Sequence, residues 1–301
     1  MLTPQTQLFL ENIKALNLPA IETIPVEILR SNYETLAMLY GGIRDSSIPF
    51  HDQLLNLPNI DKPIRVRSFH TNNPKAIILY AHGGGWTQGS LNTHHVMCQN
   101  LAKSTDSQVV SIEYSLAPEH PYPTALNEIE AVYKWAVEQY CFPINVAGDS
   151  GGANLMAGLI VRLNDLQIAL PNECIFFYPS FDLTGKLDSL KEFAEGYSLT
   201  KNSIEYYVNN YLNANLALTS LPEVSPLWVM KDIDFPSTLI IAAEKDPLRD
   251  DSRIAAKMLE EKDKLKGHLE VPGVIHAFAQ FPGLFPEATK VFEWINKFYK
   301  P

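Results

Sequence analysis

The sequence has few cysteines, and none of them form a pattern that suggests a disulfide framework. Three occur among 301 residues, at Cys98, Cys141 and Cys174, and there is no C-x-x-C pair. An odd number of widely spaced cysteines in apolar surroundings predicts free thiols in a reducing compartment. We therefore assign no disulfide and no metal ligands.

Long apolar runs and basic tracts are also missing. No apolar run approaches the length of a membrane span, and the N-terminal segment lacks the basic and apolar regions of a secretory signal. Acidic residues outnumber basic ones by 34 to 24, which gives a formal net charge of -10. Such a surface repels nucleic acid and anionic lipid. We expect a cytoplasmic protein that binds no nucleic acid and does not insert into membranes.

Short runs of branched and aromatic residues alternate with longer amphipathic stretches. Near-continuous apolar strands indicate burial on both faces, and their alternation with helices predicts a mostly parallel α/β sheet flanked by helices. The expected strands are 64–70, 76–82, 108–114, 144–149, 174–179, 238–244 and 268–273. The expected helices between and after them are 92–104, 123–140, 151–164, 248–264 and 286–299.

Two segments do not fit this alternation. Residues 1–45 look helical and precede the first strand, and residues 184–222 separate two strands of the sheet. Connections within α/β units are usually short, and a long one more often covers a site than spaces two elements. We interpret the chain, 1–301, as a single domain with a long insertion.

The stretch "INVAGDSGGANL" places a serine between glycines where a strand passes into a helix. A nucleophilic serine must stand clear of its own backbone, and a tight strand-to-helix turn achieves this when small residues flank it. Gly148 and Gly152 are those small residues, so Ser150 is the candidate nucleophile.

A serine hydroxyl needs a base, and in this type of fold the acid and then the histidine follow the serine along the chain. His276 lies after the last expected strand, and Asp246 directly follows "TLIIAAE". Asp250 and Asp251 are competing acids, but they fall within an expected helix and are interpreted as solvated.

The loop "HGGGW" (82–86) follows a central strand and can turn its amides toward an oxyanion. A phosphate-binding loop would need glycine at Gln88 or lysine at Ser90, so that alternative fails on spacing. The amide of Gly151, just after the nucleophile, should supply a further donor. His82 should order this loop, whereas His94 and His95 are expected on a surface helix without metal-ligand spacing.

From about Lys75 onward, the sequence resembles the hormone-sensitive-lipase-like (bacterial family IV) carboxylesterases of the α/β-hydrolase superfamily. The motifs that carry the resemblance are "HGGGW", "EYSLAPEHPYPTAL", "GDSGGANL", "SPLW", "EKDPLRDD" and "IHAF". The resemblance implies Ser150 as nucleophile, His276 as base and Asp246 as its orienting acid. It also implies oxyanion donors at Gly84, Gly85 and Gly151, with Gly83 as an alternative to one of the first two.

This family implies hydrolysis of short acyl esters without a cofactor or metal, a cap formed by about 1–45 and 184–222, and at times a homodimer. The cap and an aromatic lining suggest acyl chains of short to medium length. Candidates for the acyl pocket are Trp86, Tyr206, Tyr207 and Phe278. The sequence departs from the family pattern at Ser115, Gly151 and Ala277, where arginine, alanine and glycine are usual. Two alternatives stay open: another acyl hydrolase (amide, lactone or acetyl-sugar) and a non-catalytic receptor for a small ligand.

Overall fold

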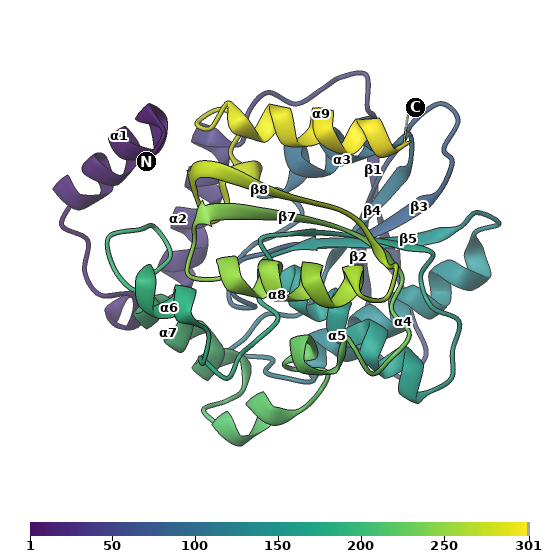
Figure 1. Ribbon diagram of the computed structural model, residues 1–301. Coiled ribbons are helices and arrows are strands. Elements are labelled where there is room, and N and C mark those ends of the chain that lie inside the picture. The colour runs from purple at the N-terminus through teal and green to yellow at the C-terminus, as the bar shows by residue number, and fades with distance from the viewer. Residues whose placement is uncertain (300–301) are drawn as a thin grey trace.

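An eight-stranded sheet runs through the part of the chain that the computed structural model describes, residues 1–299 (Figure 1). The strand order is β1-β2-β4-β3-β5-β6-β7-β8, with the first two pairings antiparallel and the remaining ones parallel. The strands are β1 (Phe50–Leu55), β2 (Ile64–Phe69), β3 (Ile77–Ala81), β4 (Gln108–Glu113), β5 (Ile144–Asp149), β6 (Glu173–Phe177), β7 (Ser237–Lys245) and β8 (Leu265–Ile275). The mostly parallel sheet predicted from the sequence is therefore confirmed.

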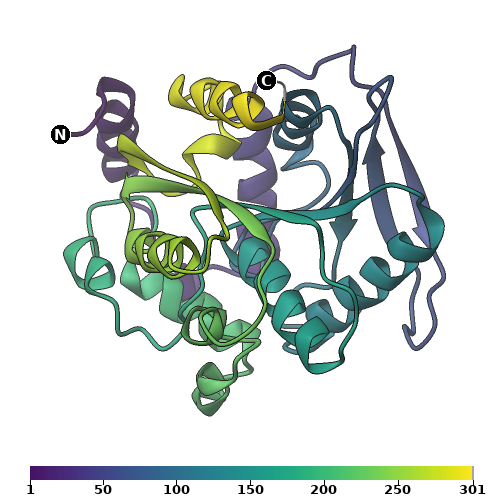
Figure 2. The same cartoon turned by 45° about the vertical axis from the view of Figure 1, so that its right-hand side comes forward.

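Helices cover both faces of this sheet (Figures 1 and 2). α3 (His95–Thr105) and α9 (Glu287–Tyr299) pack on one face. The other face carries α4 (Thr124–Gln139), α5 (Gly151–Asp165) and α8 (Arg249–Glu260). Each of these five helices overlaps one of the helices expected from the sequence.

The core consists of two layers, one on each side of the sheet. Side chains alternate along β3, so Ile77 and Leu79 join the layer under α4 and α5, while Ile78 and Tyr80 join the layer under α3 and α9. All four are fully buried. This is why the sequence of β3 is apolar throughout rather than alternating.

The fold corrects the sequence interpretation at β1 and at two histidines. β1 was not expected, because five of its six residues are exposed and its sequence carries no apolar pattern. His94 and His95 were expected on a surface helix, but both side chains are buried where α3 begins. A histidine's polarity does not reveal that the segment in which it lies packs beneath the glycine loop.

Residues 1–45 and 184–222, which did not fit the strand–helix alternation, lie together beside one end of the sheet, at the left of Figure 1. The N-terminal segment contains α1 (Pro4–Ala15) and α2 (Val26–Tyr40), and the insertion contains α6 (Asp188–Glu192) and α7 (Lys201–Tyr211). The short 3-10 helices are η1 (Ile21–Thr23), η2 (Leu216–Ser220), η3 (Pro226–Val229) and η4 (Phe278–Gln280). Among residues 1–299, no helix combines the length and apolar character needed to cross a bilayer.

Candidate active site

Ser150 occupies a sharp turn between β5 and α5. Its backbone has φ 53° and ψ -123°, a conformation that non-glycine residues rarely adopt. A Cβ on Gly152 would lie 2.1 Å from the carbonyl oxygen of Ala81, and one on Gly148 would lie 2.7 Å from the carbonyl carbon of Gly152. The flanking glycines thus allow β5, the turn and the end of β3 to approach closely, as the motif predicts.

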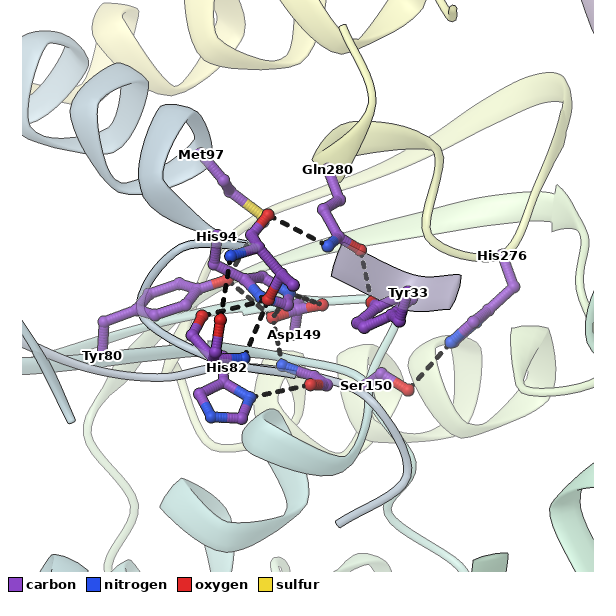
Figure 3. Close-up of polar contacts among 12 residues, drawn as sticks. Tyr33, Tyr80, His82, His94, Met97, Asp149, Ser150, His276 and Gln280 are labelled. Carbon is purple, nitrogen blue, oxygen red and sulfur yellow. Dashed lines mark hydrogen bonds and ion pairs between the residues drawn. The ribbon is translucent and has the colours of Figure 1, made fainter. Parts of the chain in front are cut away.

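The three residues that sequence reasoning assigned to a catalytic triad meet at this turn. His276 follows β8, and its Nε2 lies 2.8 Å from Oγ of Ser150 (Figure 3). Its Nδ1 lies 2.7 Å from Oδ2 of Asp246, which follows β7. Asp246 is fully buried, and its Oδ1 accepts the N–H of Leu248 at 2.8 Å. The carboxyl ends of three parallel strands thus bring a hydroxyl, an imidazole and a carboxylate into one line.

The two competing acids have other partners. Asp251 lies in α8, is 2% exposed and accepts the N–H groups of Phe181 and Asp182, each at 2.7 Å. Burial raises the pKa of Asp251 well above its usual value. The expectation that Asp251 is solvated was therefore wrong. Asp250 accepts the N–H of Ser189 at 2.9 Å, so Asp250 braces the insertion against α8, whereas Asp251 braces the segment just before the insertion.

The glycine loop passes beside Ser150. Within residues 1–299, the amides of Gly84, Gly85 and Gly151 donate to no protein acceptor. All three residues line the same cavity as Ser150. The amide of Gly83, by contrast, already donates to Oδ1 of Asp149 at 2.7 Å. The Gly83 amide is therefore engaged, and the candidate oxyanion donors are the amides of Gly84, Gly85 and Gly151.

Asp149 lies at the centre of a buried polar network (Figure 3). Besides the amide of Gly83, its carboxylate accepts the hydroxyl of Tyr80 at 2.6 Å and lies 3.3 Å from Nε2 of His94. Burial opposes the charge on Asp149, but His94 and the donated hydrogen bonds outweigh it and hold the pKa of Asp149 below its usual value. Sequence reasoning missed this residue, although it stands inside the G-D-S-G-G motif.

His82 orders the glycine loop, as the sequence suggested. Its Nδ1 lies 2.8 Å from the carbonyl oxygen of Gly83, and its ring stacks on Tyr114 with centroids 4.3 Å apart. Burial, and then the nearby His94, lower the pKa of His82 to about 3. A neutral imidazole therefore donates from Nδ1 to Gly83 at neutral pH.

A second link missed by sequence reasoning joins the N-terminal segment to the histidine loop. The hydroxyl of Tyr33 in α2 donates to Oε1 of Gln280 at 2.6 Å, and Nε2 of Gln280 donates to the carbonyl of Thr93 at 3.2 Å (Figure 3). Both residues are uncharged and far apart in sequence, so no local signal marks them. They hold α2 against the loop that carries His276.

A cavity of about 280 Å³ opens over Ser150 and His276. Of the four aromatic residues that the sequence suggested for it, Trp86 and Tyr207 line the cavity, whereas Tyr206 and Phe278 do not. Phe278 is fully buried in the core. The apolar part of the lining comes from α1, α2, α7 and the loop after His276, including Phe9, Ile13, Leu36, Ile204, Phe281 and Leu284.

No group of three or more His, Cys, Asp or Glu side chains within residues 1–299 is arranged to hold a metal ion. The chemistry that the site can perform with its own residues is nucleophilic attack by a hydroxyl, with an adjacent base and a set of amide donors.

Comparison with known proteins agrees with this geometry. A family model described as "alpha/beta hydrolase fold" matches residues 78–280. An esterase of Acinetobacter venetianus is 34% identical over 83% of this chain and 86% of its own length. An ethyl acetate hydrolase of Pseudomonas putida is 29% identical over 96% and 95%, respectively. Among solved structures, a hyperthermophilic esterase of Pyrobaculum calidifontis superposes with a TM-score of 0.90 and 27% identity, covering 99% of this chain and 98% of that one.

Proposed function

Because the chain belongs to the α/β hydrolase family, in its hormone-sensitive-lipase-like branch, and is an ester-hydrolysing enzyme, we propose that it is a serine carboxylesterase for short- to medium-chain acyl esters. The observation that carries the assignment of its site is the chain of contacts from Asp246 through His276 to Ser150, at 2.7 and 2.8 Å. This alignment is what activation of a serine hydroxyl requires.

In the proposed mechanism, Oγ of Ser150 attacks the ester carbonyl while Nε2 of His276 takes its proton. Asp246 accepts Nδ1–H of His276, which fixes the tautomer and stabilises the imidazolium. The amides of Gly84, Gly85 and Gly151 receive the negative charge that develops on the carbonyl oxygen.

When the tetrahedral intermediate collapses, the bond to the alcohol oxygen breaks and His276 protonates the departing alcohol. The acyl group then remains on Ser150. A water molecule, deprotonated by His276, attacks the acyl-enzyme, and the acid and the free serine are released.

The size and lining of the cavity support the proposed preference for short to medium acyl chains. Its volume of about 280 Å³ lies just below the ~300–1,000 Å³ that is typical of ligand sites. Segments 1–45 and 184–222 both contribute apolar walls, through residues such as Leu36 and Ile204. We propose that these two segments form a cap over the site and limit the length of the acyl chain.

The decisive experiment combines a fluorophosphonate label with a p-nitrophenyl ester series. We expect an adduct on Ser150 that is abolished in Ser150→Ala and slowed in His276→Ala. Ser180→Ala is the matched control, because Ser180 lines the same cavity while the Nε2 of His276 bonds to Ser150, and this variant should still be labelled. Labelling at another residue, or binding of esters without turnover, would overturn the proposal.

Chain-length preference is tested separately by kcat/KM across acetate, butyrate, octanoate and longer esters. A maximum at short to medium length is expected, and a preference for long, emulsified triglycerides would contradict it. The cytoplasmic location and the homodimer stay predictions. Cell fractionation would test the location, and analytical ultracentrifugation would test the oligomeric state.

A further inference from the structure

Helix α7 of the insertion presents two tyrosines to the glycine loop. Tyr207 and Tyr211 are four positions apart, so they lie on one face of the helix, one above the other. Each ring packs on a different residue of the loop: Tyr207 on Gly85, and Tyr211 on Trp86.

The contact between Tyr207 and Gly85 is direct. A Cβ on Gly85 would lie 2.4 Å from Cγ of Tyr207, so the tyrosine ring occupies the space that a side chain at this position would need. The hydroxyl of Tyr207 also accepts Nε2 of Gln88 at 3.1 Å. Gln88 in turn closes the loop, because its N–H donates to the carbonyl of Gly84 at 3.0 Å. Tyr207 therefore contacts the turn from Gly84 to Gln88 at two positions, Gly85 and Gln88.

The second contact reaches the remaining donor. The rings of Tyr211 and Trp86 are stacked, with centroids 4.5 Å apart and an interplanar angle of 9°. The indole of Trp86 also lies against Gly151, since a Cβ on Gly151 would be 3.2 Å from Cε2 of Trp86. A continuous stack thus runs from α7 through Trp86 to the amide that follows Ser150.

These contacts restrict a loop whose glycines would otherwise be flexible. Gly84 and Gly85 have φ values of +119° and +57°, which few other residues could adopt, and glycine backbones have the greatest conformational freedom. Donors to an oxyanion must nevertheless be held in place before the reaction, since a misplacement of ~1 Å can cost ~100-fold in rate. The loop has no side chains at 84 and 85 with which to fix itself, so its order must come from elements packed on it.

We propose that Tyr207 and Tyr211 are positioning residues of the oxyanion hole, through which α7 fixes the amides of Gly84, Gly85 and Gly151. The proposal rests on the proposed esterase function and adds to it: the insertion does not only bound the cavity but also completes the catalytic geometry. Although Tyr207 lines the cavity, its main effect is expected on the transition state, because it holds Gly85 and Gln88 in the loop that supplies the donors.

The test compares Tyr207→Leu, Tyr207→Phe and Gln88→Leu with the wild type. We expect Tyr207→Leu to lower kcat by about 10- to 100-fold with little change in KM, on the scale of a lost or misplaced donor. Tyr207→Phe keeps the ring and loses only the bond to Gln88, so it should lose less. Gln88→Leu should match Tyr207→Phe, and the double variant should lose no more than either.

Tyr140→Phe is the matched control, since the hydroxyl of Tyr140 accepts Nε2 of Gln108 at 3.2 Å at the opposite end of the parallel strands. It removes the same kind of hydrogen bond and should leave kcat unchanged. A second readout is inhibition by butylboronic acid, which forms a tetrahedral adduct with a nucleophilic serine. Its inhibition constant should rise in parallel with the loss of kcat/KM across the Tyr207 and Gln88 variants.

A rise in KM with unchanged kcat and unchanged boronate inhibition would overturn the proposal, because Tyr207 would then be only a wall of the cavity. That result leaves the esterase function intact. Absence of ester turnover and of boronate binding in the wild type would instead refute the proposed function. Thermal unfolding of each variant checks that it is folded at the assay temperature. If Tyr207→Leu does not fold, Tyr207→Phe and Gln88→Leu still test the proposal.

Discussion

The carboxylate of Asp149 accepts the amide of Gly83 at 2.7 Å, so the residue before Ser150 is tied to the loop that carries Gly84 and Gly85. This bond joins two turns that follow different strands, β5 and β3. This buried side chain therefore contributes directly to the placement of the nucleophile relative to the proposed oxyanion donors.

Replacement of Asp149 should affect both stability and turnover. Asp149→Ala leaves the amide of Gly83, the hydroxyl of Tyr80 and His94 without their acceptor, and should cost about 3–5 kcal/mol of unfolding free energy, as for a broken buried pair. Asp149→Asn keeps an acceptor oxygen and should retain more of both stability and kcat. Urea denaturation and steady-state kinetics on the two variants check this order; equal losses would contradict it.

The two glycines after Ser150 should respond differently to alanine. A methyl group on Gly152 would meet the carbonyl oxygens of Ala81 and His82 at 2.1 and 2.5 Å, and backbone atoms cannot move aside. Gly152→Ala should therefore destabilise the protein by about 1–3 kcal/mol or more. A methyl group on Gly151 would meet the indole of Trp86 at 3.2 Å and the backbone nitrogen of Trp86 at 3.4 Å, so a shift of the indole by a few tenths of an ångström accommodates it.

Alanine is favoured over glycine by about 1 kcal/mol in a helix interior and by less at the first position of α5, which Gly151 occupies, so helix propensity offsets a small part of the crowding in Gly151→Ala. We expect this variant to fold with stability near the wild type and to keep measurable turnover. Thermal unfolding of Gly151→Ala and Gly152→Ala, measured side by side, would reveal the difference. A larger loss for Gly151→Ala than for Gly152→Ala would refute the packing argument.

The acid stability of the protein should depend on His95. Its Nδ1 lies 3.2 Å from Nη1 of Arg67, which can only donate, so the imidazole is neutral. Burial, followed by the charges of Arg44 and Arg67, lowers the pKa of His95 to about 4. Between pH 4 and the unfolded pKa of ~6.5, only the unfolded chain binds this proton, so unfolding free energy falls as pH decreases, by at most ~1.4 kcal/mol per pH unit.

His95→Asn places an amide oxygen close to the position of Nδ1 and cannot titrate. Its unfolding free energy should therefore decline less steeply than that of the wild type from pH 6.5 to pH 4. Chemical denaturation at several pH values in this window measures the two slopes. If the unfolding free energies of the two proteins fall in parallel with pH, His95 does not contribute to the loss of stability at low pH.

Arg30 should anchor the N-terminal segment in a way that lysine cannot reproduce. Its guanidinium donates to the carbonyls of Thr87 and Ala117 at 2.9 and 3.0 Å and to both carboxylate oxygens of Glu119. The pair with Glu119 is partly exposed and contributes little, whereas the two carbonyls lose a charged donor when Arg30 is replaced.

Arg30→Met should cost about 1–3 kcal/mol, and Arg30→Lys nearly as much, because a lysine ammonium cannot bond to all four acceptor oxygens as the planar guanidinium does. Glu119→Gln should cost less than either. Thermal unfolding and limited proteolysis of residues 1–45 compare the three variants. Full stability of Arg30→Lys would show that charge rather than fork geometry holds the segment.

The sequence interpretation placed elements and residues correctly where the signal lies in neighbouring residues or in their order along the chain. The apolar runs of β3 and β5, the glycines around Ser150 and the order of Ser150, Asp246 and His276 are all local or ordered signals, and the structure places the three residues within hydrogen-bond distance. It failed at β1, whose exposed residues show no pattern, and at Asp251, whose carboxylate is buried by a segment distant in sequence.

Strand periodicity and turn glycines are properties of short stretches, and residue order can be read directly along the chain. Together they were sufficient to identify the sheet, the sharp turn at Ser150 and the three aligned side chains. Only the tertiary structure shows which side chains contact the glycine loop. Gln88 and Tyr207 are 119 positions apart, and Asp149 and Gly83 are 66 apart. Contacts of this kind depend on how whole helices and strands are placed in space, and no short-range pattern carries that information.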